Sequence, residues 1–169
     1  MNIAFFSAQK YEKPFFEHSI TPHNSLAMTY FEQSLNEQTA VLASNYNAVC
    51  VFVNDTVNAQ VIKLLAAQGV NTILLRCAGF NNVDLDAAKA HNIHVLRVPA
   101  YSPEAVAEHC IALMLTLSRK THKAYNRVRE DNFDLNGLLG FNLHNKTVGI
   151  IGCGKIGLAL CNILNGFGA

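Results

Sequence analysis

Gly152-Cys153-Gly154-Lys155-Ile156-Gly157, close to the carboxyl end of this 169-residue chain, is the stretch that decides the fold. The apolar residues 147–151 before it are predicted to form a buried strand, and residues 156–164 after it are predicted to form a helix. Strand, glycine-rich turn and helix in this order indicate the start of a dinucleotide-binding βαβ unit. In that pattern Gly152 permits the tight turn, Gly154 lets the backbone approach a pyrophosphate, and Gly157 lets helix and strand pack closely. We expect the free N–H groups of the helix N-terminus to bind the phosphates.

The composition is typical of a compact α/β protein, with 50% hydrophobic and 15% charged residues. The net charge is +1 and there is no basic block, so we expect neither nucleic acid nor a membrane as a partner. The longest apolar runs, such as residues 110–117, fall well short of the roughly 20 residues that cross a bilayer. Residues 1–6 lack the basic segment of a signal peptide and are predicted to be a first strand. A cytoplasmic protein is therefore expected.

Neither the cysteines nor the histidines indicate a metal site. The five cysteines form no C-x-x-C pair, and their mostly apolar neighbours predict buried, reduced thiols. His91 and His94 are three positions apart, but they flank a predicted helix-to-strand turn and no third ligand is apparent.

Strand-like and helix-like runs alternate over residues 1–100. The candidate strands are residues 3–7, 26–31, 48–53, 72–75 and 94–98, and the candidate helices lie near residues 12–19, 36–43, 58–68 and 85–91. Short runs rich in Val, Ile and Leu indicate a mostly parallel sheet that is covered by helices on both faces. Residues 1–100 are therefore predicted to be a doubly wound α/β domain of the flavodoxin type.

Residues 101–143 are predicted to hold a long interdomain helix and a connection. Ser102-Pro103-Glu104 is a helix start, and no Gly or Pro follows before about Arg129. The first half of this helix is apolar nearly all round, which predicts burial between other elements. The basic second half is interpreted as a solvated face rather than as a nucleic-acid site. Residues 144–169 are then the start of the nucleotide-binding domain, which stops after one βα unit.

Residues 74–84 form a candidate ligand loop, because they run off a predicted strand, turn at Gly79 and enter a predicted helix. Ligands of open α/β sheets bind at the carboxyl ends of strands, so this loop is placed to present backbone N–H groups to a small carboxylate. The alternative is a tight turn that needs glycine for its backbone angles, and spacing alone does not choose between the two. Asn82 or Asp84 is expected to cap the next helix.

Residues 76–85 (RCAGFNNVDL), residues 98–109 (VPAYSPEAVAEH) and the glycine-rich turn together resemble the D-isomer-specific 2-hydroxyacid dehydrogenases. The resemblance covers essentially the whole chain, and the bacterial fermentative members that form D-lactate match it best. It implies reversible hydride transfer between NADH and pyruvate. The substrate-binding positions that it implies are the backbone amides of Ala78 and Gly79, with Tyr101 and Phe52 around the pocket. The positions implied to bind the NAD pyrophosphate are Gly152, Gly154, Lys155, Ile156 and Gly157.

The resemblance also implies that this chain holds none of the family's catalytic residues. The substrate-orienting Arg, the acid/base His and its Glu partner all come from a later part of the coenzyme domain, and so does the acidic residue that binds the ribose. The segment that returns to complete the first domain is missing as well. His109 lies on the linker helix and is not expected to replace the catalytic His. We expect the 169-residue chain to be an inactive N-terminal part of a homo-oligomeric dehydrogenase; the alternatives are a non-catalytic binding module or assembly partner, or a dehydrogenase for a bulkier 2-hydroxy acid.

Overall fold

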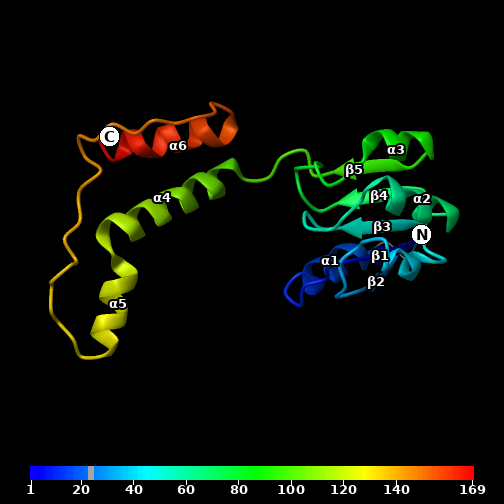
Figure 1. Cartoon of the computed structure of the whole chain (residues 1–169), viewed down its shortest axis with the longest axis horizontal. Helices are drawn as coiled ribbons and strands as arrows, with labels where there is room; N and C mark the ends of the chain where they lie inside the picture. Colours follow the sequence, from blue (N-terminus) through cyan, green and yellow to red (C-terminus); the bar gives the residue numbers. More distant parts are fainter. Residues whose placement is uncertain (23–24) are drawn as a thin grey trace. The chain divides into compact units, whose positions relative to one another are not determined.

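The computed structural model describes residues 1–22 and 25–169, which divide into two compact units, Met1–Pro99 and Ala100–Ala169 (Figure 1). Among the described residues, no helix has both the length and the apolar composition that a bilayer crossing needs.

The first unit is built on a five-stranded, fully parallel sheet with the order β2-β1-β3-β4-β5 (Figure 1). The strands are β1 (Asn2–Phe5), β2 (Ala27–Tyr30), β3 (Ala48–Val51), β4 (Thr72–Leu75) and β5 (His94–Arg97). The helical elements between them are α1 (Lys13–Ile20), the 3-10 helix η1 (Ala40–Ala43), α2 (Ala59–Ala67) and α3 (Leu85–Ala90). The strand order reverses at β1 and β3, as in flavodoxin-type sheets, so the predicted fold class is confirmed.

Alternating side chains of the strands supply two separate cores. On β3, Val49 and Val51 pack on the face that η1, α2 and α3 cover, together with Ile62 of α2. Ala48 and Cys50 lie on the opposite face, in the cluster that includes Phe16 of α1. Both faces of this strand are fully buried, which explains why its sequence is a continuous apolar run rather than an alternation.

The helix predicted over residues 36–43 is wrong for its first half, since only Ala40–Ala43 form a helical turn, of the 3-10 type. The side chain of Asn36 accepts hydrogen bonds from the backbone N–H groups of Gln38 (2.9 Å) and Thr39 (3.1 Å). The hydroxyl of Thr39 donates back to the carbonyl of Ser34 at 2.6 Å. These local side-chain bonds offer the backbone an alternative to helix, and here the alternative prevails.

The second unit contains α4 (Pro103–Arg119), α5 (Thr121–Arg129) and α6 (Lys155–Gly166). The helix predicted to run unbroken from Ser102 to about Arg129 is therefore interrupted, at Lys120, whose φ of 52° is left-handed. Its Nζ donates to the carbonyl of Gly137 at 2.9 Å, so a segment that lies far along the chain stabilises the break. A Cβ on Gly140 would overlap the carbonyl of Ser118, which shows how closely the same loop lies against the end of α4.

Helix α4 packs along α6, but it is less buried than its apolar sequence predicts (Figure 1). Ile111 of α4 and Leu164 of α6 are buried in a shared cluster, whereas Leu113 and Leu117 on other faces of α4 are exposed. Residues 147–151, predicted to be a buried strand, pair with no strand of the described residues, and Ile151 is fully exposed. A parallel strand exists only through its ladder, so the segment does not form one without a partner.

The prediction of buried thiols holds fully for only one of the five cysteines. Cys50 is buried, Cys77, Cys110 and Cys161 are half-buried, and Cys153 is exposed in the glycine-rich turn. Cys153 lies in the turn between Gly152 and Gly154, and its side chain is exposed although the segments on both sides of the turn are mostly apolar.

A matched pair of isoleucines tests where the core lies. Ile62 is completely buried and Ile151 is completely exposed. We expect Ile62→Ala to lower the free energy of unfolding by about 2–5 kcal/mol, because transfer and cavity costs add. Ile151→Ala is expected to change it by less than about 0.5 kcal/mol. Urea denaturation of the 169-residue chain measures both, and equal effects would contradict the assigned core.

Candidate functional site

The loops after β1 and β3 meet at the carboxyl edge of the sheet around one buried carboxylate. Asp55 is 2% exposed, and its Oδ1 accepts hydrogen bonds from the Ser7 hydroxyl (2.6 Å) and the Leu35 N–H (2.9 Å). Its Oδ2 accepts from the Phe52 N–H at 2.6 Å. Ser7 adopts a left-handed backbone with φ of 51°, an uncommon conformation for a residue with a side chain. The Asp55 carboxylate therefore fixes three separate segments of this edge.

Arg76, the first residue after β4, crosses the same edge. Its Nε lies 3.0 Å from Oε1 of Glu12, and the two side chains are only 7% and 12% exposed. Its Nη2 donates to the carbonyl of Ser7 at 2.8 Å. The guanidinium carbon lies 4.2 Å from the ring centroid of Phe5 and 4.9 Å from that of Phe52. Arg76 thus links α1, β1 and the loop after β3.

Phe52, which follows β3, is held through its backbone as well as its ring. Its carbonyl accepts from the Asp55 N–H (3.0 Å) and from Nδ2 of Asn82 (3.2 Å). Phe52 is half-buried, and the Arg76 guanidinium carbon lies over its ring. Close by, burial raises the pKa of the Cys50 thiol to about 11, although the Arg76 guanidinium acts to lower it. That thiol is therefore neutral at physiological pH and is not a nucleophile.

The loop after β4 leaves open space beside Gly79. The φ of Gly79 lies outside the left-handed range, and a Cβ placed there would contact nothing. Backbone angles therefore do not require glycine at this position, which removes the main support for a purely conformational role. Asp84, and not Asn82, caps α3, since its Oδ1 accepts from the Ala87 N–H at 2.9 Å.

Arg97, at the end of β5, holds the peptide unit between Ala78 and Gly79. Its Nη1 donates to the carbonyl of Ala78 at 2.7 Å, and its guanidinium carbon lies 5.3 Å from the ring centroid of Phe80. In a trans peptide the N–H points away from the C=O, so this bond directs the Gly79 N–H away from Arg97. A guanidinium on the carbonyl also strengthens the N–H as a donor. The loop thus presents a fixed donor next to unfilled space.

The glycine-rich turn of the second unit has the geometry that its pattern requires. Gly152 has a left-handed φ of 99°, and a Cβ on Gly157 would overlap the Gly152 carbonyl oxygen. A Cβ on Gly154 would contact nothing, and no side chain caps the N-terminus of α6 there. The turn is therefore closed by Gly152 and Gly157, while Gly154 leaves its backbone accessible at the positive end of a helix.

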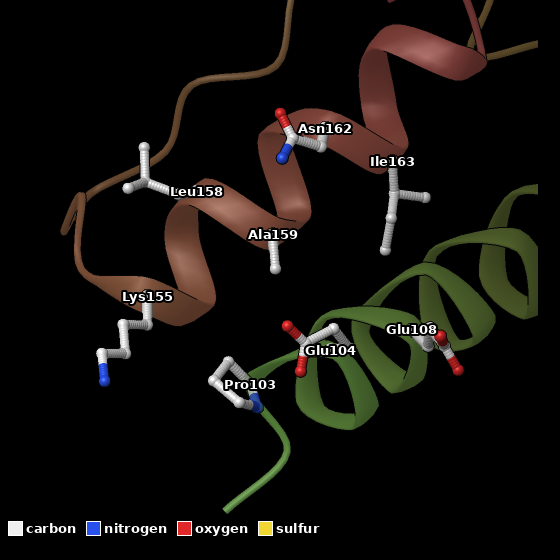
Figure 2. Close-up of a pocket in the computed structure, with 8 residues that line it drawn as sticks. All are labelled: Pro103, Glu104, Glu108, Lys155, Leu158, Ala159, Asn162 and Ile163. Atoms are coloured by element: carbon white, nitrogen blue, oxygen red, sulfur yellow. The ribbon is translucent and has the colours of Figure 1, made fainter. Parts of the chain in front are cut away.

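Figure 2 shows the groove between the N-terminal parts of α4 and α6, of about 440 Å³. Ala159 and Ile163 point from α6 toward α4, and Glu104 points toward α6. Lys155 extends away from both α4 carboxylates, and among the described residues no ion pair of Lys155 is formed. Its ammonium group is therefore available to an anion at the start of α6.

The structure places the expected site residues in two groups. Phe52, Ala78 and Gly79 lie at one edge of the first unit's sheet, since β3 and β4 are adjacent. Tyr101, 64% exposed, belongs to the second unit with the glycine-rich turn. The sequence analysis missed Asp55, Arg76 and Arg97. One signal was available for the two arginines: Arg76 directly follows a predicted strand and Arg97 lies near the end of another, at the edge where ligands bind.

Family models match nearly the whole chain. Residues 3–135 match the catalytic domain of the D-isomer specific 2-hydroxyacid dehydrogenases, and residues 111–169 match the NAD binding domain of the same family. The chain belongs to this family. Its cofactor is NAD, and the open backbone at Gly154 and the uncapped N-terminus of α6 fit a pyrophosphate.

Several relatives match over almost the whole chain. A 2-hydroxyacid dehydrogenase homolog of Haemophilus influenzae is 53% identical, and the D-lactate dehydrogenase of Escherichia coli is 49% identical. The aligned segments cover 99% of this chain and 50% and 51% of those proteins, so the chain spans about half their length. The apo structure of the Escherichia coli enzyme superposes with a TM-score of 0.91, covering 99% of this chain and 53% of that one.

A structure with bound ligands is also similar. The D-lactate dehydrogenase from Aquifex aeolicus, complexed with NAD and lactic acid, is 29% identical and superposes with a TM-score of 0.80 over 99% of this chain and 49% of that one.

Two glycines of α6 test the close approach within the turn. Alanine is favoured over glycine in helices by about 1 kcal/mol, so propensity alone predicts that both Gly157→Ala and Gly166→Ala stabilise α6. Because the new Cβ at position 157 meets the Gly152 carbonyl, we expect Gly157→Ala to lower the protection of the α6 amides from hydrogen exchange. A Cβ at position 166 meets nothing, so Gly166→Ala should preserve or raise that protection. Equal protection in both variants would contradict the packing of the turn.

Proposed function

We propose that this chain is the N-terminal part of an NAD-dependent D-lactate dehydrogenase, which converts pyruvate, NADH and a proton to D-lactate and NAD⁺. The observation that carries the proposal is the 49% identity to the Escherichia coli D-lactate dehydrogenase over 99% of the chain. The unfilled space beside the Gly79 N–H supports it, because a small substrate carboxylate needs an accessible backbone donor.

In this proposal the first unit binds the substrate. The N–H groups of Ala78 and Gly79 hold the carboxylate, and the Arg97 bond to the Ala78 carbonyl keeps the Gly79 donor in place. Phe52 forms an apolar wall against the substrate methyl group. Fixed donors of this kind lower the cost of orienting the keto carbon for attack.

The second unit holds the cofactor, which supplies the hydride. Backbone N–H groups from Gly154 to Gly157 and the Lys155 ammonium bind the pyrophosphate, and the α6 dipole adds to the attraction. In this proposal the family's substrate-orienting Arg and its His–Glu acid/base pair lie outside these 169 residues. The 169 residues therefore dock substrate and part of the cofactor, but they transfer no proton and have no dehydrogenase activity alone.

The test completes the chain with the matching C-terminal half of the Escherichia coli enzyme, joined in frame after Ala169; we call this the completed enzyme. We expect pyruvate-dependent loss of NADH absorbance from the completed enzyme and none from the chain or the added half alone. The product should be oxidised by a D-lactate-specific and not by an L-lactate-specific dehydrogenase.

Two outcomes would overturn parts of this proposal. Turnover by the pure, monodisperse 169-residue chain would show that the chain is catalytic by itself. A folded completed enzyme that reduces bulkier 2-oxo acids but not pyruvate would replace D-lactate as the product.

Two open glycines separate substrate binding from cofactor binding in the completed enzyme. A Cβ at Gly79 or at Gly154 contacts nothing in the chain, so neither substitution by alanine should lower the melting temperature. We expect Gly79→Ala to raise the KM for pyruvate at least about tenfold, equivalent to about 1.4 kcal/mol, with the Kd of NADH unchanged. We expect Gly154→Ala to raise the Kd of NADH and to leave the KM for pyruvate unchanged. Each variant is the control of the other. If either variant changed both the KM for pyruvate and the Kd of NADH, the assignment of Gly79 to substrate binding and of Gly154 to cofactor binding would be contradicted.

A further inference from the structure

We propose that Arg76 and Asp55 are positioning residues that fix Phe52 and thereby set the size of the 2-oxo acid that the pocket accepts. This inference rests on the proposed function, because it assumes that Phe52 forms a wall of the substrate pocket.

The ring of Phe52 is held by the guanidinium of Arg76. The guanidinium carbon lies 4.9 Å from the ring centroid, and the plane itself is anchored by Glu12 at 3.0 Å and by the Ser7 carbonyl at 2.8 Å. A guanidinium held by two such bonds is a fixed cation, and its attraction to the face of the Phe52 ring limits the freedom of that ring to rotate. Phe52 is half-buried.

The backbone of Phe52 is held by the side chain and main chain of Asp55. The Phe52 N–H donates to Oδ2 of Asp55 at 2.6 Å, and the Asp55 N–H donates to the Phe52 carbonyl at 3.0 Å. Asn82 adds a third bond at 3.2 Å, from the same loop that carries Ala78 and Gly79. The backbone of Phe52 is thus held by Asp55 and Asn82, and its ring is held by the guanidinium of Arg76.

Stability alone does not explain why charged groups perform this task. Removing a guanidinium and a carboxylate from water costs several kcal/mol per ion, and well-packed apolar residues often replace a buried pair without loss. The ion pair of Glu12 and Arg76 leaves Nη1 of Arg76 buried without a hydrogen-bond partner among the described residues, and an apolar pair would fill the same volume. An anchored guanidinium does what an aliphatic side chain does not, since its charge attracts the face of an aromatic ring.

The experiment measures substrate selectivity in the completed enzyme with Arg76→Lys. Lysine keeps the positive charge within reach of Glu12 but has no plane on which a ring can stack. We expect the ratio of kcat/KM for pyruvate to that for 2-oxobutyrate to fall about tenfold, with the Kd of NADH unchanged. Arg129→Lys is the matched control, because Arg129 also lies over an aromatic ring, that of Tyr125, at 5.8 Å in the second unit. It should leave the ratio unaltered.

A double-substitution cycle shows whether Arg76 acts through Phe52. Phe52→Ala alone should lower the same ratio, and adding Arg76→Lys to it should produce no further change. If the Arg76→Lys variant does not fold, the Glu12→Gln variant is measured in its place, because it removes the ion pair of Arg76 and keeps the guanidinium. We expect the selectivity ratio to fall in this variant too, but by less. Circular dichroism and melting curves show which variants are folded.

An unchanged selectivity ratio in a folded Arg76 or Glu12 variant would overturn the inference. So would a shift that persists in full in the Phe52→Ala background, because Arg76 would then act by another route. Failure of the proposed function is visible separately: the completed enzyme without any substitution would then not reduce pyruvate. If it reduces another 2-oxo acid instead, the same cycle is measured with that acid and its next homologue.

Discussion

The buried carboxylate of Asp55 is the constraint on which the carboxyl edge of the sheet depends. An ionised carboxylate is costly to bury unless hydrogen bonds replace its lost water, and here a hydroxyl and two backbone amides do so. Those donors come from Ser7, Leu35 and Phe52, three segments that are distant in the sequence. Satisfying one charge therefore closes the loops after β1, β2 and β3 around a common point, and the left-handed backbone of Ser7 is held in place by that closure.

The two arginines of this edge have partners of different charge. Glu12 neutralises Arg76 beneath the edge, whereas Arg97 donates to a neutral carbonyl and keeps its charge. A positive charge beside the Ala78–Gly79 peptide favours an anion on the N–H side of that peptide. The charge of Arg76 is thus balanced by Glu12 within the edge, whereas Arg97 places a positive charge beside the Ala78–Gly79 peptide.

The sequence predicted the elements that local chemistry decides, and it failed where distant residues decide. All five strands of the sheet were placed within one or two residues, because each is a short run rich in apolar residues between turn signals, and Asp84 was recognised as one of two candidate caps. The break at Lys120 has no Gly or Pro to signal it, because its stabilising bond reaches across 17 positions to Gly137. Arg76 likewise finds Glu12 across 64 positions, so its role in holding Phe52 follows only from the folded sheet.

The two halves of the proposed site differ in how far they are supported by contacts of their own unit. Phe52 and Gly79 are held by Asp55, Arg76 and Arg97, which all belong to the first unit. In the glycine-rich turn Gly157 lies against Gly152, and residues 147–151 before it pair with no strand among the described residues. Val148 and Ile150 of that segment pack against the buried cluster of Ile111, Leu143 and Leu164. The proposed carboxylate site is thus held by charged side chains, whereas the turn is held by backbone contacts and by apolar packing on two helices.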